Sequence, residues 1–107
     1  MRFTVDLTQS AERDLEEVYR HVAAGDGTDR AEKLFTALIE ACRSLADFPG
    51  RGNRPKELSD LAGRDIREAH YKPYRILYEV KGDLVVVHAV LDGRRDMLTL
   101  LEQRLMR

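Results

Sequence analysis

The chain has 107 residues, 43% of them apolar, and its 18 Lys or Arg nearly balance its 19 Asp or Glu. This length suits one hydrophobic core, because two cores would each bury too little surface, so we expect a single domain over residues 1–107. The longest apolar stretch, residues 84–91, falls far short of the roughly 20 residues of a membrane helix. Residues 1–6 lack the apolar segment of an export signal. We therefore expect a cytoplasmic protein that does not enter a membrane.

Charge is distributed unevenly along the chain. Residues 1–50 contain six Lys or Arg and ten Asp or Glu, whereas residues 51–107 contain twelve and nine, so the halves carry −4 and +3. Dedicated nucleic-acid-binding domains are usually much more basic and carry aromatic stacking residues. We therefore expect no direct sequence-specific DNA binding by this chain alone.

The single cysteine, Cys42, excludes an internal disulfide. No second cysteine and no paired histidines stand at metal-ligand spacing around it. Cys42 is therefore predicted to be a small core residue, and the sequence predicts no metal and no other cofactor.

The N-terminal residues predict a strand and then a helix. Apolar and polar residues alternate over residues 3–7, which is the period of a strand with one buried face. Thr8 or Ser10 can then cap a helix, and Gly25 and Gly27 are expected to end it. The apolar residues of this helix recur at helical spacing; they are Ala11, Leu15, Val18, Tyr19 and Val22.

A second helix is expected directly after the first. Asp29 and Glu32 resemble a capping box at its start. An apolar stripe then continues as far as residues 48–50, and it consists of Ala31, Leu34, Phe35, Leu38, Cys42 and Leu45. Two antiparallel helices joined by a short turn are the predicted result.

The second half of the chain predicts a loop, three strands and a last helix. Residues 51–64 lack periodicity and read as a loop, with one helical turn near residues 58–61. Because Lys72-Pro73 interrupts the segment, residues 65–71 and 74–80 are either two strands or one bent edge strand, and we predict two strands. A turn at residues 81–83 then leads into a strand over residues 84–91. That last strand is apolar on both faces except at His88, which favours a central position in the sheet.

This order predicts a two-layer α+β domain of order β-α-α-β-β-β, with a short helix capped by Asp96 at the C-terminus. The helical hairpin is expected to pack on one face of a mainly antiparallel sheet. Strand alternation places Arg75 and Glu79 on the other face, so that face carries charge in its middle. We interpret it as a partner surface.

Several segments resemble the ParE/RelE toxin superfamily. Residues 74–80 (Tyr-Arg-Ile-Leu-Tyr-Glu-Val) precede a Gly-Asp turn, and an apolar strand then ends in residues 91–96 (Leu-Asp-Gly-Arg-Arg-Asp). Residues 11–19, 45–49 and 52–58 also fall where the superfamily has similar residues. The order and spacing of these segments make the chain resemble the superfamily over nearly its whole length.

The resemblance implies a cytoplasmic bacterial toxin that a cognate antitoxin holds inactive. In the ParE-like branch the toxin blocks DNA gyrase by binding, and its antitoxin is ParD-like; the residues that the resemblance favours for target binding are Tyr71, Arg75, Arg94 and Arg95. In the RelE-like branch the toxin cuts messenger RNA on the ribosome, and the site here would consist of His70, Arg75, His88 and Arg94.

The C-terminal residues favour the ParE-like branch. RNA cleavage needs a base, an acid and cations that stabilise the transition state. Residues 97–107 contain neither tyrosine nor histidine, so the late acid or base of the RelE-like branch is missing. No catalytic residue is therefore expected.

Other interpretations of these residues stay open at this point. His88 suits a core histidine with a hydrogen-bond partner better than a catalytic base, and His21 is expected to be exposed. Arg94 and Arg95 can form local ion pairs with Asp92 and Asp96. The chain could also be a degenerate toxin that only binds an antitoxin, or an unrelated α+β interaction domain.

Overall fold

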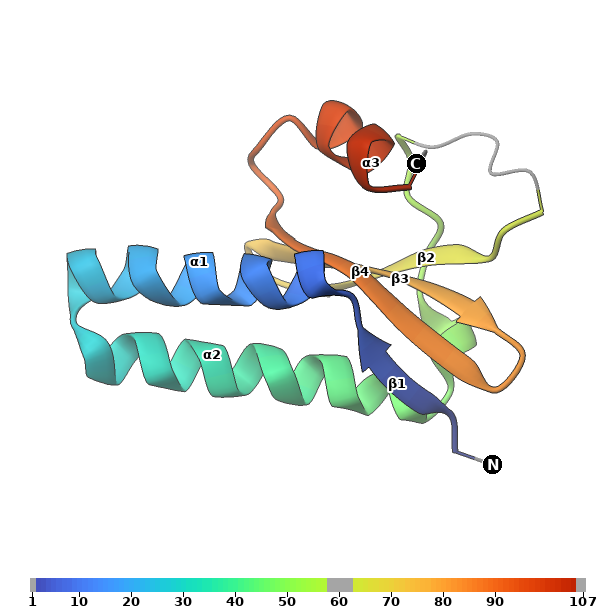
Figure 1. Cartoon of the computed structure of the whole chain (residues 1–107), viewed down its shortest axis with the longest axis horizontal. Coiled ribbons are helices and arrows are strands. Elements are labelled where there is room, and N and C mark those ends of the chain that lie inside the picture. The colour runs from blue at the N-terminus through green and yellow to red at the C-terminus, as the bar shows by residue number, and fades with distance from the viewer. Residues whose placement is uncertain (1, 58–62, 106–107) are drawn as a thin grey trace.

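The computed structural model describes residues 2–57 and 63–105 (Figure 1). Two helices follow the first strand, three strands follow the helices, and a third helix ends the described chain, so the predicted α+β order is confirmed. The elements are β1 (Thr4–Leu7), α1 (Gln9–Asp26), α2 (Thr28–Arg43), β2 (Ile66–Tyr71), β3 (Tyr74–Lys81), β4 (Leu84–Asp92) and α3 (Met97–Leu105), with two short 3-10 turns, η1 (Ser44–Ala46) and η2 (Pro49–Arg51). The helical turn predicted near residues 58–61 lies outside the described residues.

Helix α1 begins where its sequence predicts. The side chain of Thr8 accepts a hydrogen bond from the backbone N–H of Ala11 at 3.1 Å, which satisfies one of the free donors at the helix start. The helix continues through Gly25 and ends at Asp26, because Gly27 takes a backbone φ of 93° that only glycine adopts without strain. Gly27 alone therefore ends α1.

Helix α2 differs from its prediction at both ends. It begins at Thr28, and its N-cap Gly27 makes no side-chain capping bond, so the predicted capping box of Asp29 and Glu32 is wrong. Asp29 lies inside the first turn instead of before it. The helix ends at Arg43, and the chain continues through η1 and η2.

The sheet has the order β1-β4-β3-β2. Strand β1 pairs with β4 in parallel, whereas β4 with β3 and β3 with β2 pair antiparallel. The predictions of a mainly antiparallel sheet and of a central β4 are therefore confirmed.

A β-bulge lies in β4 at His88. Leu77 pairs with Ala89 and Tyr78 with Val87, so His88 is an extra residue between two paired positions. Val87 packs in the core under the hairpin, whereas Ala89 packs on the opposite side of the sheet. The bulge thus shifts the alternation of side chains along β4.

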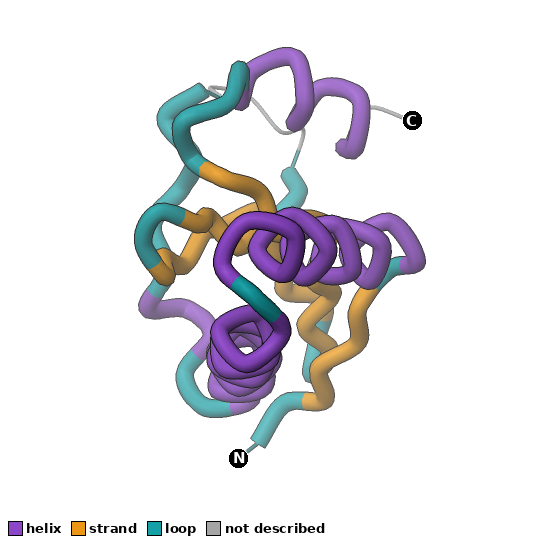
Figure 2. Tube along the Cα trace, turned by 90° about the vertical axis from the view of Figure 1, so that its left-hand side faces the viewer, coloured by secondary structure: helices purple, strands orange, loops and turns teal. Residues whose placement is uncertain are grey.

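Both faces of the sheet are covered by helices. The hairpin packs on one face, and Figure 2, which looks along the hairpin, shows α2 and α3 at opposite ends of the view with the strands between them. Met97, Leu101 and Leu105 of α3 pack with Ile66 and Leu77 of the sheet. The second face is therefore not the open partner surface that its charge pattern suggested, because α3 covers it.

The hairpin extends beyond the sheet at the end where α1 turns into α2 (Figure 1). Tyr19 and Phe35 meet edge to face between the two helices, with ring centroids 6.1 Å apart. Across the described ranges, no helix has the length and apolarity needed to cross a membrane.

Candidate binding surface and buried ion pairs

Tyr71, Arg94 and Arg95 lie at one end of the sheet. Tyr71 pairs with Tyr74, which in turn pairs with Asp92, so these residues form a row across β2, β3 and β4. The side chains of Arg94 and Arg95 are exposed, and Tyr71 is 41% exposed. These three residues form what we call the Tyr71–Arg95 surface.

The loop after β4 is ordered by hydrogen bonds. The backbone N–H of Gly93 donates to the carbonyl of Pro73 at 2.7 Å. Arg94 donates to Asp92 from Nε at 2.9 Å and from an Nη at 2.6 Å, so the predicted ion pair of Arg94 is confirmed. These bonds lower the pKa of Asp92 to about 2, and the Arg94 side chain remains 78% exposed.

A cavity of about 270 Å³ lies beside this surface, between α1 and the last residues of β4. Arg95 reaches it from the loop, Glu17 and His21 line it from α1, and Tyr74 and Asp92 from the sheet. His21 is exposed, as predicted. Because the lining contains both carboxylates and a guanidinium group, the cavity suits a polar side chain of a partner.

Arg75 is held by two carboxylates. Its Nη atoms donate to Glu57 at 2.7 and 2.8 Å, and its Nε donates to Glu68 at 3.2 Å, while an Nη makes a second bond to Glu68. His70 Nε2 lies 2.7 Å from the other oxygen of Glu68. The side chain of Arg75 is only 12% exposed, so Arg75 is not available as an open contact residue of the charged face.

The hydrogen bonds between Arg75 and Glu57 shift the pKa values of both side chains. The hydrogen bonds from Arg75 lower the pKa of Glu57 to about 2, and those to Glu57 are the largest cause that raises the pKa of Arg75 above its usual range. Both groups therefore stay charged at neutral pH, and the positive charge of Arg75 is neutralised locally.

A second cluster surrounds Glu79, which is 3% exposed. Arg64 donates to its two oxygens at 2.8 and 3.1 Å, and His88 Nε2 lies 2.9 Å from Oε1. Arg64 also donates to the carbonyl of Leu105 in α3 at 2.6 Å. The hydrogen bond from Arg64 is the main cause that lowers the pKa of Glu79 to about 2. The predicted hydrogen-bond partner of His88 is confirmed, and its side chain is 15% exposed.

The four residues of the RelE-like alternative belong to three separate clusters. Arg75 and His70 share Glu68, whereas His88 pairs with Glu79, and Arg94 pairs with Asp92 beyond the end of the sheet. The structure therefore does not bring these residues together around one open position.

Sequence reasoning missed the carboxylates that organise these clusters. Glu57 belongs to a loop without periodicity, so nothing in the sequence placed it next to Arg75. Asp14 did carry a signal, because it lies on the apolar stripe of α1, three residues from Ala11 and one from Leu15, and it is buried. A carboxylate at such a position needs a charged or hydrogen-bonding partner.

Cys42 is buried in the core under the hairpin and is 1% exposed. Burial raises the pKa of its thiol to about 11. Among residues 2–57 and 63–105, no three His, Cys, Asp or Glu side chains gather closely enough to hold a metal ion.

The fold is shared with solved structures of toxin–antitoxin systems. The chain superposes on a structure of the chromosomal ParDE toxin–antitoxin system from P. aeruginosa with a TM-score of 0.70 and 23% identity, over 83% of this chain and 94% of that one. It superposes on the toxin–antitoxin complex RelBE2 from Mycobacterium tuberculosis with a TM-score of 0.64 and 25% identity, over 86% and 92%. A mutant of the E. coli toxin RelE in the free state shares the fold with a TM-score of 0.52 and 20% identity, over 99% and 96%.

Sequence comparison assigns the chain more narrowly. Residues 5–97 match the family described as the ParE toxin of the type II toxin-antitoxin system, parDE. Toxin ParE3 of Caulobacter vibrioides is 29% identical over 97 residues, which cover 91% of this chain and 93% of that protein. The chain therefore belongs to the ParE toxin family of type II toxin–antitoxin systems, and the match to the family ends at the first residue of α3.

Proposed function

We propose that this toxin acts in the bacterial cytoplasm by binding DNA gyrase, without cutting RNA, and that a ParD-like antitoxin neutralises it. The observation that carries this proposal concerns the arginines on the sheet face opposite the helical hairpin. The cations there, Arg64 and Arg75, are each bonded to buried or half-buried carboxylates. A phosphate that entered would meet those carboxylates before it met a free cation.

The chemistry of RNA cleavage makes this arrangement unfavourable. Cleavage needs a base for the 2′-hydroxyl, an acid for the leaving oxygen, and cations at the phosphorane. Here His88 is bonded to Glu79 and His70 to Glu68, in different clusters. These contacts support a toxin that works by binding.

The Tyr71–Arg95 surface suits contact with the target. Two exposed arginines beside a half-exposed tyrosine are residue types that are enriched at protein interfaces. We assign target contact to Tyr71, Arg94 and Arg95. We assign Arg75 a positioning role, because its guanidinium binds Glu57 of the preceding loop and holds that loop on the sheet.

The hairpin offers a surface to the antitoxin. A groove of about 480 Å³ formed by residues of α1 and α2 is lined mainly by apolar atoms, and its lining residues are Glu16, Tyr19, Arg20, Glu32 and Phe35. A disordered tail that folds on binding must cover a large area to offset its ordering entropy. Two of the structural relatives are described as toxin–antitoxin systems or complexes, which supports an antitoxin as the partner here.

The test adds the purified toxin to DNA gyrase, ATP and relaxed plasmid. We expect loss of supercoiling and trapped linear DNA on a gel, both reversed by the ParD-like protein encoded beside the toxin. The same protein should raise the Tm of the toxin, because it binds only the folded form. Unimpaired gyrase would contradict the proposal.

The alternative is ribosome-dependent RNA cleavage through His70, Arg75, His88 and Arg94, which the likeness to RelBE2 at 25% identity favours. Primer extension on a translated messenger RNA detects it. Cleavage with unimpaired gyrase would establish this alternative, and the absence of both activities together with normal cell growth would indicate a degenerate toxin.

A further inference from the structure

Phe48 is the most exposed large apolar side chain of the described residues, at 80%. Ala46 and Pro49, on either side of Asp47 and Phe48, are buried, so the chain turns one aromatic ring outward from a packed segment. Its backbone angles are φ 55° and ψ 57°, and Phe48 is the only residue other than glycine with positive φ in the part of the chain described here. A bulky L-residue is strained in this conformation.

The fold gains little from this arrangement. A ring that is 80% exposed contributes little burial to the core, and glycine would adopt the same backbone angles without strain. Strained residues persist only where the surrounding structure fixes them, and they concentrate at functional sites. Stability alone therefore does not account for a phenylalanine at this position.

The surrounding residues fix this loop firmly. Buried Tyr78 donates its hydroxyl to the carbonyl of Pro49 at 2.5 Å. Arg67 donates to the carbonyls of Gly50 and Gly52 at 2.8 and 2.9 Å. We call residues 47–52 the Phe48 loop.

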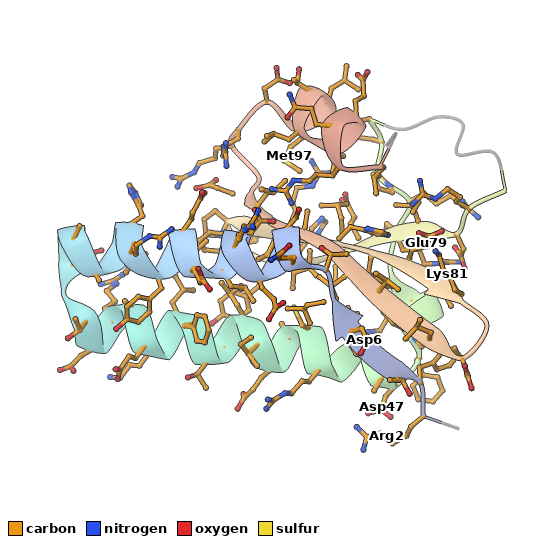
Figure 3. The ribbon with its side chains drawn as sticks, in the orientation of Figure 1. Arg2, Asp6, Asp47, Glu79, Lys81 and Met97 are labelled. Atoms are coloured by element: carbon orange, nitrogen blue, oxygen red, sulfur yellow. The ribbon has the colours of Figure 1, made fainter. Side chains whose placement is uncertain are left out.

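Further bonds hold the start of the Phe48 loop. Arg51 donates to the carbonyl of Asp47 at 3.2 Å and to the hydroxyl of Ser44 at 3.0 Å. Figure 3 shows Asp47 beside Arg2, near the N-terminal end of β1, and their side chains form an exposed ion pair at 3.4 Å. The ring of Phe48 is thus presented on a preorganised support, which lowers the entropic cost of binding.

The chemistry of this loop defines the partner. Residues 49–56 contain three basic residues, Arg51, Arg54 and Lys56, and no acidic one. One protruding ring needs a concave apolar pocket, and the basic residues that follow it in the chain favour carboxylates around that pocket. A second copy of this chain would bring like charges together, and an extended antitoxin tail needs a groove instead of a protruding ring.

A nucleic acid suits the loop less well than a protein does. An aromatic ring with neighbouring arginines can stack on a base. However, the guanidinium groups of Arg51 and Arg67 already donate to carbonyls of the loop. A single ring without a second stacking residue favours a protein pocket.

We propose that Phe48 anchors the toxin to its folded protein target by inserting into an apolar pocket with an acidic rim. This inference rests on the proposed function for the identity of that target, which is then DNA gyrase. The Phe48 loop lies at the start of β4, because the N–H of Phe3 donates to the carbonyl of Ala46 at 2.9 Å and Thr4 pairs with Leu84. The Tyr71–Arg95 surface lies at the other end of β4, so the two surfaces are separate.

The test compares Phe48→Gly with the wild-type toxin. Glycine removes the ring and relieves the strain, so the Tm should equal or exceed that of wild type. We expect gyrase affinity to fall about 30-fold, as for a binding hot spot, with antitoxin affinity unchanged. Phe48→Asn, which also tolerates positive φ, should behave alike. Leu98→Ala is the matched control, because Leu98 is 47% exposed on α3 and should leave gyrase affinity unchanged.

Growth arrest on expression provides a readout that does not depend on gyrase. If the wild-type toxin arrests growth without binding gyrase, the proposed function is wrong. The proposed role of Phe48 then holds only if Phe48→Gly and Phe48→Asn abolish growth arrest while Leu98→Ala does not. Wild-type gyrase affinity or arrest in a stably folded Phe48→Gly overturns the anchor. Loss of antitoxin binding in Phe48→Gly also contradicts this role, because the partner of Phe48 is then the antitoxin. Loss of binding to a single-stranded oligonucleotide contradicts it as well, because the partner is then a nucleic acid.

Discussion

Arg104 in α3 and Asp14 in α1 form a two-pronged ion pair, with Nη to Oδ distances of 2.6 and 2.8 Å. Asp14 also accepts the backbone N–H of Val90 at 3.0 Å, and Arg104 donates to the carbonyl of His88 at 3.3 Å. The pairing of β1 with β4 ends at Val87. Side chains from two helices therefore form hydrogen bonds with the backbone of β4 where β1 no longer pairs with it. The same side chains connect α3 to α1.

Asp14→Ala should destabilise the fold by about 3 kcal/mol, the lower end of the range for a broken buried pair, because Arg104 is 24% exposed. The change leaves the guanidinium and the N–H of Val90 without their acceptor. Asp14→Asn keeps an acceptor for Val90 and should cost less. Urea denaturation measures the free energy of unfolding.

The double variant Asp14→Ala, Arg104→Met tests whether the pair itself is responsible. It should be more stable than Asp14→Ala alone, because it removes the unpaired buried cation. Simple addition of the two single effects would show that the residues do not interact.

Acid should destabilise the fold between about pH 4.5 and pH 2. The hydrogen bonds from Arg64 and Arg75 lower the pKa values of Glu79 and Glu57, respectively, from 4.5 to about 2. The folded state therefore binds fewer protons than the unfolded state in this window, and the stabilisation present above pH 4.5 is lost as pH falls. Melting curves between pH 7 and pH 2 measure it.

Glu79→Gln provides the control for the acid effect. It should lower the Tm at pH 7 and flatten the fall of the Tm toward acid, because one of the carboxyls with a lowered pKa is gone. A wild-type Tm that stays constant from pH 6 to pH 3 would contradict the linkage.

The order of the elements could be predicted because it depends on local periodicity. The strand predicted over residues 84–91 is Leu84–Asp92 in the structure, and that over residues 74–80 is Tyr74–Lys81. The bulge at His88 was not predictable, because an extra residue in one strand is defined only by its partner strand. The start of α2 was missed because Gly27 serves both helices.

The site was predicted less well, because its contacts join distant segments. Alternation placed Arg75 on the correct face of the sheet, but neither Glu57 nor the cover by α3 is encoded within the strand. Phe48 follows Leu45 at helical spacing, which predicts a buried position. Helix α2 ends before Phe48, and Phe48 takes a positive φ with its ring exposed.

Cys42 should report on unfolding. The thiol is 1% exposed and burial raises its pKa to about 11, so little thiolate is present at pH 8 in the folded chain. We expect slow reaction with a thiol reagent in native buffer and fast reaction in guanidinium. Cys42→Ser serves as the blank, and equal rates in both buffers would show that Cys42 is accessible in the folded state.

Arg75→Ala should destabilise the chain by about 2–3 kcal/mol, because it leaves Glu57 and Glu68 facing each other without their cation. Arg75→Lys should recover part of the stability, since lysine keeps the charge but cannot bridge both carboxylates in the same fork geometry. The RelE-like alternative instead predicts full loss of RNA cleavage in a stably folded Arg75→Ala. Thermal melts and primer extension on the same preparations distinguish the two roles.

Replacing both Arg94 and Arg95 by alanine should weaken gyrase inhibition and leave the Tm unchanged. Both side chains are exposed, so the fold loses little, whereas removal of two charges from the rim of an interface slows association on the order of tenfold. Because exposed charges are screened by salt, the difference from wild type should shrink at high ionic strength. Replacing both Arg13 and Lys33 by alanine controls for the same change in net charge, because both are exposed residues of the hairpin outside the assigned surfaces. An equal loss of inhibition in this control would show that overall charge, and not the Tyr71–Arg95 surface, sets the association rate.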